Sequence, residues 1–278
     1  MPLLDNPPSP ALAVPAAAGA AAVPCIPKII HYVWVGPKPM PAKDAAFVEG
    51  WKRLMPDWEF RFWNNETVDI GSSRWLKGAY AMKGWNKISD YMRLWALREH
   101  GGIYLDTDIE LLKPLDGLLH HRCFLGLQAD ERGRDWRNYD EWVNGAVIGA
   151  EPGHWFPREC FDTLMRVQGW QSTGSWTGPG LVTEVLARHG LKGPSQELAE
   201  YDGVTVFPTR YFYPYAHGAE LTPACVRPDT VAIHHWAATW TGEAKRWPLS
   251  KKIMMRVARV SPSLAYRLRR HQLDRKPA

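Results

Sequence analysis

The sequence predicts an α/β fold with a mostly parallel central sheet and flanking helices. Two kinds of segment alternate along the chain. In one kind, typical of strands, every second residue is apolar; in the other, typical of helices, apolar residues recur every three or four positions. A strand, helix, strand, helix, strand order at these lengths indicates parallel βαβ units. The chain has 278 residues, 45% of them hydrophobic, which is enough to bury a sizeable core.

The first half of the chain supplies the clearest elements. Residues 26–36 read IPKIIHYVWVG, in which apolar and polar residues alternate until Gly36-Pro37 ends the strand. Residues 86–100 carry apolar side chains at helical spacing, and Gly101 fits the position just past a helix end. The predicted elements are, in order, a strand at 26–36, a helix at 41–54, a strand at 58–64, a helix at 86–100 and a strand at 103–106.

The second half is less regular, because the pattern changes after Asp116. A charged loop separates its first two strands, and the Gly-rich segment STGSWTGPG at 172–180 precedes its second helix. The predicted elements are strands at 123–128 and 144–150, helices within 151–168 and at 181–190, and strands at 204–208 and 231–236.

Composition divides the chain into three parts. Residues 1–25 are rich in Ala and Pro and contain no base, which predicts a disordered leader, with a cleaved signal peptide as the alternative. Residues 26–244 form the α/β domain. Residues 245–278 form a tail with eleven Lys or Arg and one acid, whereas the whole chain carries +5, so the remainder is about five charges negative. Nucleic acid is therefore not an expected partner.

Residues 98–108 read REHGGIYLDTD and place two carboxylates at the end of a short apolar strand. Side chains two apart in a strand lie on one side, so Asp106 and Asp108 are expected to face one ligand while Thr107 points away. Open α/β sheets bind their ligands at the carboxyl ends of parallel strands. Carboxylate oxygens suit Mg²⁺ or Mn²⁺, which complete their shells with phosphate and water. The alternative is a solvated strand end.

The helix before this strand favours the ligand-binding interpretation. Ser89, Asp90 and Arg93 lie near its start, and Asp90 and Arg93 are i, i+3 neighbours on one face. The guanidinium of Arg93 offers a fork for a phosphate or for sugar hydroxyls. An Asp–Arg pair on the surface is the structural alternative.

Together these residues form the composite motif SDxxRxxxLxxxGGIYxDxD, which runs from Ser89 to Asp108. This motif resembles the signature of the DXD-containing sugar-transferase family. That family includes bacterial capsule and lipopolysaccharide glycosyltransferases and yeast initiating mannosyltransferases, with the glucosylating domains of large clostridial toxins as distant relatives. The segments IPKIIHYVWVG, NGAVIGAEPGH and AIHHWAATW also resemble the family, so the resemblance covers residues 26–242.

The resemblance implies a GT-A-like nucleotide-diphospho-sugar transferase fold that uses Mn²⁺ or Mg²⁺. It implies catalytic roles for Asp106, Asp108 and Trp240, and an ion held by Asp108 and Asp106 with His234. The residues that it implies for donor binding are Trp34, which stacks on the base, with Ser89, Asp90, Arg93, Asp106 and Asn144. The structural alternative for Trp34 is a place in the core.

Two adjacent histidines compete for the ion. His234 and His235 point to opposite faces of a strand, so only one of them can reach it. The spacing to Trp240 favours His234, while alignment with more distant branches of the family shifts by one residue and favours His235.

The predicted function is a metal-dependent hexosyltransferase of the DXD type. It moves a sugar from a UDP- or GDP-sugar to a glycan or lipid-linked acceptor, and the family implies retention of the anomeric configuration. The ion neutralises the charge that develops on the leaving diphosphate. Loops 128–142 and 172–180 are expected to set specificity, with Trp176 in a lid. Two alternatives stay open: a non-catalytic sugar-nucleotide-binding protein and a nucleotide-sugar hydrolase.

The basic tail predicts a membrane surface as a partner. KKIMMRVARV at 251–260 has apolar residues on one helical stripe and bases beside it, as an interfacial helix would. The alternative is a helix packed on the domain with its bases in water. No segment has the apolar length to span a bilayer, and four separated cysteines indicate a reducing compartment. We therefore expect a cytoplasmic protein, peripheral on the inner face of the membrane.

Overall fold

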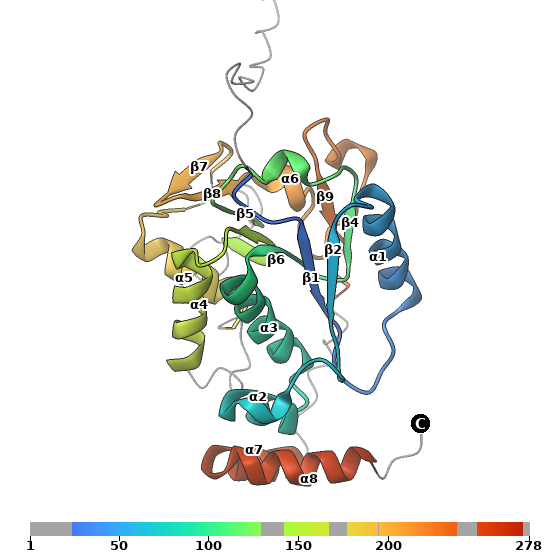
Figure 1. Cartoon of the computed structure of the whole chain (residues 1–278), viewed down its shortest axis with the longest axis vertical. Helices are drawn as coiled ribbons and strands as arrows, with labels where there is room; N and C mark the ends of the chain where they lie inside the picture. Colours follow the sequence, from blue (N-terminus) through green and yellow to red (C-terminus); the bar gives the residue numbers. More distant parts are fainter. Residues whose placement is uncertain (1–23, 129–141, 167–176, 194, 238–248, 275–278) are drawn as a thin grey trace, which may run out of the picture.

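A computed structural model describes residues 24–128, 142–166, 177–193, 195–237 and 249–274. Its centre is a seven-stranded sheet with the strand order β2-β1-β3-β6-β5-β8-β7 (Figure 1). The strands of this sheet are β1 (Ile29–Val33), β2 (Glu59–Trp63), β3 (Gly102–Leu105), β5 (Cys123–Leu127), β6 (Val143–Ala150), β7 (Ala199–Tyr201) and β8 (Val204–Phe207). A separate antiparallel pair joins β4 (Ile109–Leu111) and β9 (Ala232–His234).

The central sheet is mixed, because three of its six strand pairings are parallel and three are antiparallel, so it is less parallel than predicted. Strand β1 pairs in parallel with β2 and β3, and β5 pairs in parallel with β8. Strand β6 lies antiparallel between β3 and β5, and β7 lies antiparallel at the edge beside β8. Five of the seven strands therefore run in one direction, and the predicted α/β fold with flanking helices is confirmed.

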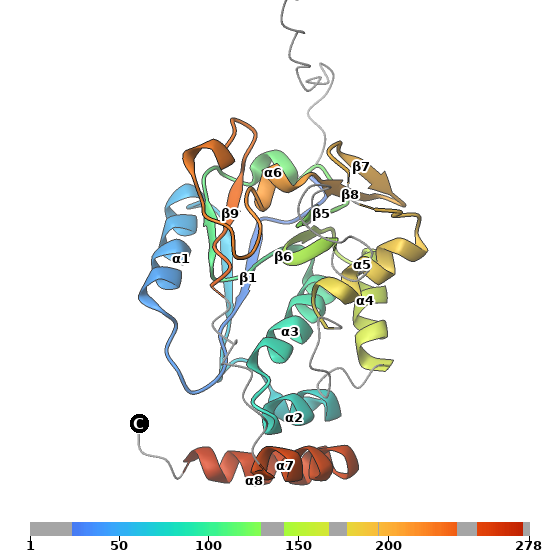
Figure 2. The same cartoon turned by 180° about the vertical axis from the view of Figure 1, so that it is seen from behind.

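Helices cover both faces of the sheet (Figures 1 and 2). On one face, α1 (Ala42–Leu54) packs Val48 and Trp51 with Ile30 and Tyr32 of β1. On the other face, the core includes Val33 and side chains of α3 (Trp85–His100), α4 (Trp155–Arg166) and α5 (Pro179–Arg188). The alternation along β1 thus feeds two separate cores, because successive side chains of a strand point to opposite faces.

The two glycines before β3 are required by the backbone. Gly101 and Gly102 have φ angles of 63° and 98°, in the region that side chains rarely adopt. A Cβ at Gly101 would lie 2.7 Å from the nitrogen of Pro152, and one at Gly102 would lie 2.7 Å from the carbonyl oxygen of Ile29. The pair ends α3 and lets the next strand enter the sheet beside β1.

Each strand and helix predicted for the regular part of the chain is present, mostly with shorter bounds. Among the described residues, the short helices and strands that sequence reasoning missed include α2 (Arg74–Ala81), β4, β7 and α6 (Thr209–Phe212). Helix α2 contains Gly78, a residue with low helix propensity, and the three-residue strands are too short to show a period. Most of the predicted leader, loop residues 129–141, Trp176 and Trp240 lie outside the described residues.

The basic tail forms two helices that pack on the domain. Helices α7 (Leu249–Val260) and α8 (Pro262–Asp274) lie beneath α2 in Figure 1, and Met254, Ala258 and Ala265 join the core there. The ring of Tyr266 meets that of Tyr80 at 5.2 Å, and Arg269 Nε donates a hydrogen bond to the carbonyl oxygen of Ala81 at 2.8 Å. One face of the tail therefore matches the packed alternative.

The opposite face of the tail is exposed and partly apolar. Ile253, Val260, Leu264 and Leu268 expose 51%, 84%, 41% and 43% of their surface. Among the described residues, no helix combines the length and apolar character needed to cross a bilayer.

Candidate functional site at the carboxyl edge of the sheet

Three neighbouring parallel strands end together at one edge of the sheet. His31 of β1 is paired with Tyr104 of β3, and Val33 of β1 with Trp63 of β2. The residues that directly follow these three strands are Trp34, Asn64 and Asp106. The aspartate pair and the predicted base-stacking tryptophan therefore share the edge where α/β sheets bind ligands.

Asp106 and Asp108 lie in a turn rather than on a strand. Strand β3 ends at Leu105, and the backbone amide of Ile109 donates to the carbonyl oxygen of Asp106 at 3.1 Å. The turn brings both aspartates together with His234, whose ligand atom lies within 4.8 Å of those of the two carboxylates. The two carboxylates lie close together, as expected. The geometric reason for that expectation was wrong, because β3 ends at Leu105 and the alternation of a strand does not extend to them.

Strands β4 and β9 hold the histidine against the second aspartate. His234 is the register partner of Ile109, and its Nε2 lies 3.3 Å from Oδ1 of Asp108. The other oxygen, Oδ2, accepts a hydrogen bond from the amide of Ala237 at 2.8 Å. Burial alone would raise the pKa of Asp108, but the hydrogen bonds from His234 and Ala237 outweigh it and hold this pKa below its usual value.

The neighbouring histidine points elsewhere. Nε2 of His235 lies 2.7 Å from Oε2 of Glu110, and its ring stacks on Phe47 at 4.8 Å. Between the two histidines that the sequence left open, His234 is the one that lies with the aspartates.

The donor set fits a divalent ion. Asp106, Asp108 and His234 offer two carboxylates and an imidazole, which suit Mn²⁺-type ions. The Nδ1 atom of His234 is buried and has no hydrogen-bond partner among the described residues. Nε2 is the nitrogen that faces Asp108, so it is the atom that would bind the ion, and Nδ1 of the same ring does not reach that ion as well.

Arg93 joins this group to helix α3. Its side chain is 7% exposed; Nη1 donates to Asp90 Oδ1 at 3.1 Å, and Nη2 donates to Asp106 Oδ1 at 2.9 Å. The Nε atom of Arg93 is buried without a partner among the described residues. A Cβ at position 145 would lie 2.6 Å from Nη1, so Gly145 of β6 leaves the room that the guanidinium occupies. The Asp–Arg pair is therefore buried and not the surface pair of the structural alternative.

Two further residues extend the cluster, and sequence reasoning missed both. Lys87 Nζ donates to Thr177 Oγ1 at 2.8 Å, and that hydroxyl donates to Asp90 Oδ2 at 2.6 Å. Burial raises the pKa of Asp90 and lowers the pKa of Lys87. The i, i+3 spacing from Lys87 to Asp90 was a signal that the sequence contained. Thr177 gave none, because it reaches Asp90 from 87 positions away along the chain.

The remaining predicted donor-binding residues lie around this cluster. Ser89 Oγ lies 2.9 Å from the hydroxyl of Tyr104, which donates to Asp106 Oδ1 at 2.7 Å. Asn144 is buried, donates to Gln128 Oε1 at 2.6 Å and accepts from the amide of Ala146 at 2.7 Å. The side chain of Asn144 thus already has partners on β6 and at the end of β5.

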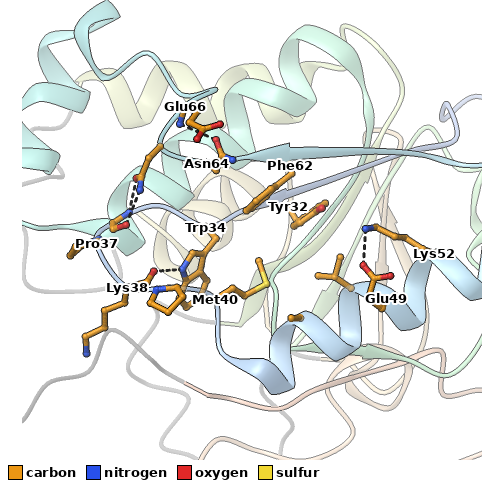
Figure 3. A pocket seen from close by; sticks show the side chains of 15 residues that line it. Tyr32, Trp34, Pro37, Lys38, Met40, Glu49, Lys52, Phe62, Asn64 and Glu66 are labelled. Carbon is orange, nitrogen blue, oxygen red and sulfur yellow. Dashed lines mark hydrogen bonds and ion pairs between the residues drawn. The ribbon is translucent and has the colours of Figure 1, made fainter. Parts of the chain in front are cut away.

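Trp34 lines an open pocket between α1 and the strands β1 and β2 (Figure 3). The pocket has a volume of about 610 Å³, with Tyr32, Trp34, Phe62 and Met40 as its large apolar side chains. Trp34 is half-buried, and its Nε1 donates to the carbonyl oxygen of Lys38 at 2.8 Å. The Trp34 ring therefore faces a pocket that Asp106 and Asp108 do not line.

Comparisons with known proteins connect this geometry to a family. Residues 41–125 match the family model described as a glycosyltransferase sugar-binding region containing a DXD motif. The chain is 31% identical over 135 residues to glucan organizing enzyme 1 of Cryptococcus neoformans. This match covers 48% of this chain and 33% of that protein. The chain is 35% identical over 163 residues to lactosylceramide 4-alpha-galactosyltransferase of Rattus norvegicus, covering 54% and 40%.

Among solved structures, the chain is similar to the galactosyltransferase LgtC in complex with donor and acceptor sugar analogs. The identity is 16%, the TM-score is 0.45, and the match covers 84% of this chain and 96% of LgtC. By contrast, the chain spans less than half the length of both sequence relatives. The family match begins one residue before α1 and ends within β5, so it contains Ser89, Asp90, Arg93, Asp106 and Asp108. The resemblance predicted from the composite motif is thereby confirmed, because residues 41–125 match the model of the glycosyltransferase sugar-binding region that contains the DXD motif.

Proposed function

We propose that the protein is a glycosyltransferase that moves a sugar from a nucleotide diphosphate to an acceptor hydroxyl with the help of a divalent ion. The observation that carries this proposal is the meeting of Asp106, Asp108 and His234 at the carboxyl edge of the sheet. The family match within residues 41–125 supports the same conclusion.

Each part of the cluster has a task in this reaction. Asp108, Asp106 and His234 would hold Mn²⁺ or Mg²⁺, which when bound neutralises negative charge on the leaving diphosphate. Nε of Arg93, which has no partner among the described residues, would donate to a phosphate or sugar oxygen, and the buried pair with Asp90 would hold the guanidinium in place. Asp90 and Ser89 orient sugar hydroxyls. We place Trp240 over the donor on the family resemblance alone.

We further propose that the anomeric configuration is retained. In the cluster, both carboxylates that lie with His234 are committed to the ion, and Asp90 is paired with Arg93 and Thr177. None of these three carboxylates is left as a covalent nucleophile. Retention itself is taken from the family resemblance. Because none of these carboxylates is free to form a covalent intermediate, we place the attack on the front face, where the acceptor approaches from the side that the leaving group departs.

The experiment that tests the function measures nucleotide release. The full chain is incubated with UDP- and GDP-sugars, with and without Mn²⁺, and with and without a glycan or lipid-linked acceptor. Release that needs both ion and acceptor supports the transferase. Release without acceptor favours the nucleotide-sugar hydrolase, binding without release favours the non-catalytic protein, and full turnover in excess chelator contradicts the role of the ion.

Trp34 is proposed as the platform for the donor base. We expect Trp34→Ala to weaken nucleotide binding by about 1–3 kcal/mol, the range for a base stacked on an aromatic ring. Calorimetric titration with the sugar nucleotide gives this value, and the melting temperature of the same variant gives its stability. Trp155→Ala is a matched control, because Trp155 is also half-buried and its Nε1 also donates to a carbonyl oxygen at 2.8 Å. A lower melting temperature with unchanged affinity would make Trp34 a core residue.

A membrane surface is proposed as the place where the acceptor is met. The exposed apolar residues of α7 and α8 lie among exposed bases, namely Lys252, Arg256 and Arg267. Each base near an anionic surface contributes about 1 kcal/mol. The relative named lactosylceramide 4-alpha-galactosyltransferase supports a lipid-linked acceptor for this chain as well. We retain a cytoplasmic location, on the inner face of the membrane, as part of this proposal.

We expect the full chain to bind vesicles that contain anionic lipid and to lose this binding in high salt, because screening weakens the attraction. Reversing Lys252, Arg256 and Arg267 to Glu should abolish binding without unfolding the chain, since all three side chains are exposed. Reversing the exposed Arg53, Arg158 and Lys192 is the matched control. Equal vesicle binding by the two triple variants, measured by co-sedimentation, would contradict the proposal.

A further inference from the structure

Helix α1 is fastened to the turn that holds the two aspartates. Thr107 stands between Asp106 and Asp108, and its hydroxyl donates to Oδ2 of Asp44 at 2.9 Å. Two residues further along, the carbonyl oxygen of Ile109 accepts a hydrogen bond from Nε1 of Trp51 at 2.8 Å. Asp44 and Trp51 belong to the same helix, so α1 holds the chain on both sides of Asp108.

The contact between Asp44 and Thr107 is buried. Asp44 is 4% exposed and Thr107 is 7% exposed. A buried carboxylate is costly unless it is hydrogen-bonded, and a pair of apolar side chains would fill this space without that cost. The hydrogen bond between Thr107 and Asp44 is therefore expected to fix the position of the turn more than to stabilise the fold. It ties the side chain at the centre of the turn to α1, next to both carboxylates.

Helix α1 also contacts His235, the residue that directly follows His234. His235 stacks on Phe47, its Nδ1 lies 3.3 Å from Nζ of Lys43, and its Nε2 lies 2.7 Å from Oε2 of Glu110. His235 directly follows β9, so its contacts with α1 hold the end of the strand that carries His234. Lys43, Asp44, Phe47 and Trp51 lie at helical spacing on one side of α1. That side contacts the aspartate turn and the histidine strand together.

We propose that Asp44 is a positioning residue for the divalent ion, acting through the hydroxyl of Thr107 on the Asp106–Ile109 turn. This inference rests on the proposed function and extends it to residues that do not touch the ion. Groups that orient metal ligands in this way change metal affinity by about 10–100-fold when they are removed. The negative charge of Asp44 close to Asp108 adds to the attraction for a cation.

The test is the affinity of the full chain for Mn²⁺ alone, measured by calorimetry and by the electron paramagnetic resonance signal of the ion. Thr107→Val removes the hydroxyl but keeps the shape, and we expect it to weaken Mn²⁺ binding about 10–100-fold. Thr107→Ser keeps the hydroxyl and should bind like the wild type. Asp44→Asn keeps an acceptor oxygen for Thr107 and loses the charge, so we expect a smaller loss than for Thr107→Val.

Thr205→Val controls for the general effect of losing a buried hydroxyl, because Thr205 is 3% exposed and lies 3.0 Å from Nδ1 of His121, away from the aspartates. Its Mn²⁺ affinity should equal that of the wild type. If Thr107→Val does not fold, Asp44→Ala and Asp44→Asn take its place, with Asp44→Ala expected to bind Mn²⁺ more weakly than Asp44→Asn.

The outcomes separate this inference from the function on which it rests. Wild-type affinity for Mn²⁺ in every folded Thr107 and Asp44 variant overturns the inference and leaves the metal-dependent transferase standing. A loss of affinity in Thr107→Ser equal to that in Thr107→Val also overturns it, because the hydroxyl would then not matter. If the wild type itself does not bind Mn²⁺, the proposed role of the ion is overturned, and this inference with it.

Discussion

The Asp108→Asn variant is expected to lose sugar transfer by at least about 10²-fold, the scale on which a site loses activity when one group that stabilises developing charge is removed. The carboxylate is replaced by a neutral amide, so the ion loses a charged ligand. The fold should survive, because the amide oxygen of Asn can still accept the hydrogen bond that Oδ2 of Asp108 receives from Ala237. Circular dichroism and a urea titration check the fold, and a single-turnover assay with Mn²⁺ measures the activity.

Asp57→Asn provides the control for this change. The side chain of Asp57 is 63% exposed and pairs with Lys28 at 2.5 Å, away from the aspartate turn. Its removal should leave transfer unchanged. A folded Asp108→Asn variant with full turnover would rule out the metal-dependent mechanism.

Replacement of Arg93 by Met should destabilise the protein by about 3–5 kcal/mol, the usual cost of removing one partner of a buried ion pair. Asp90 and Asp106 would both lose the guanidinium that neutralises them, and Asp90 is buried. Urea unfolding at pH 7 measures this free energy. Donor binding should also weaken in the fraction that remains folded, because Met has no group that can donate a hydrogen bond to the phosphate or sugar as Nε of Arg93 is proposed to do.

Two further variants sharpen the result for Arg93. Arg93→Lys should recover only part of the stability, because an ammonium group does not span both carboxylates as the planar fork does. Arg61→Met removes a partly exposed arginine that pairs with Glu59 at 2.6 Å, and it should cost no more than about 1 kcal/mol. An equal loss in Arg61→Met and Arg93→Met would show that the buried pairs have no special role.

The sequence predicted the fold because its signals are local. Alternation in residues 26–36 and helical spacing in 86–100 report which face of each element is apolar, and the short connections leave few ways to arrange them. The partners of Asp90 were partly predictable for the same reason, since Arg93 is a neighbour on the same helix. Strand β4 was not predicted, because three residues are too few to show the alternation of apolar and polar side chains.

The rest of the site depends on contacts between distant parts of the chain. Thr107 meets Asp44 from 63 positions away, and Thr177 meets Asp90 from 87 positions away. Nothing in the residues around Asp44 distinguishes it from an acidic residue in the first turn of any helix. Such partners follow from the packing of α1 and α5 on the sheet, which is a property of the whole fold.

Because Arg93 and Tyr104 both donate to Oδ1 of Asp106, binding of the ion and binding of the donor are expected to be coupled. Oδ1 of Asp106 accepts from Arg93 at 2.9 Å and from Tyr104 at 2.7 Å, while Asp106 also belongs to the group that suits an ion. For an ion held by Asp106 and a donor held by Arg93, each ligand changes the affinity for the other by the same factor, as thermodynamic reciprocity requires. The affinity for Mn²⁺ would then change when the donor is bound, and the affinity for the donor would change by the same factor when Mn²⁺ is bound.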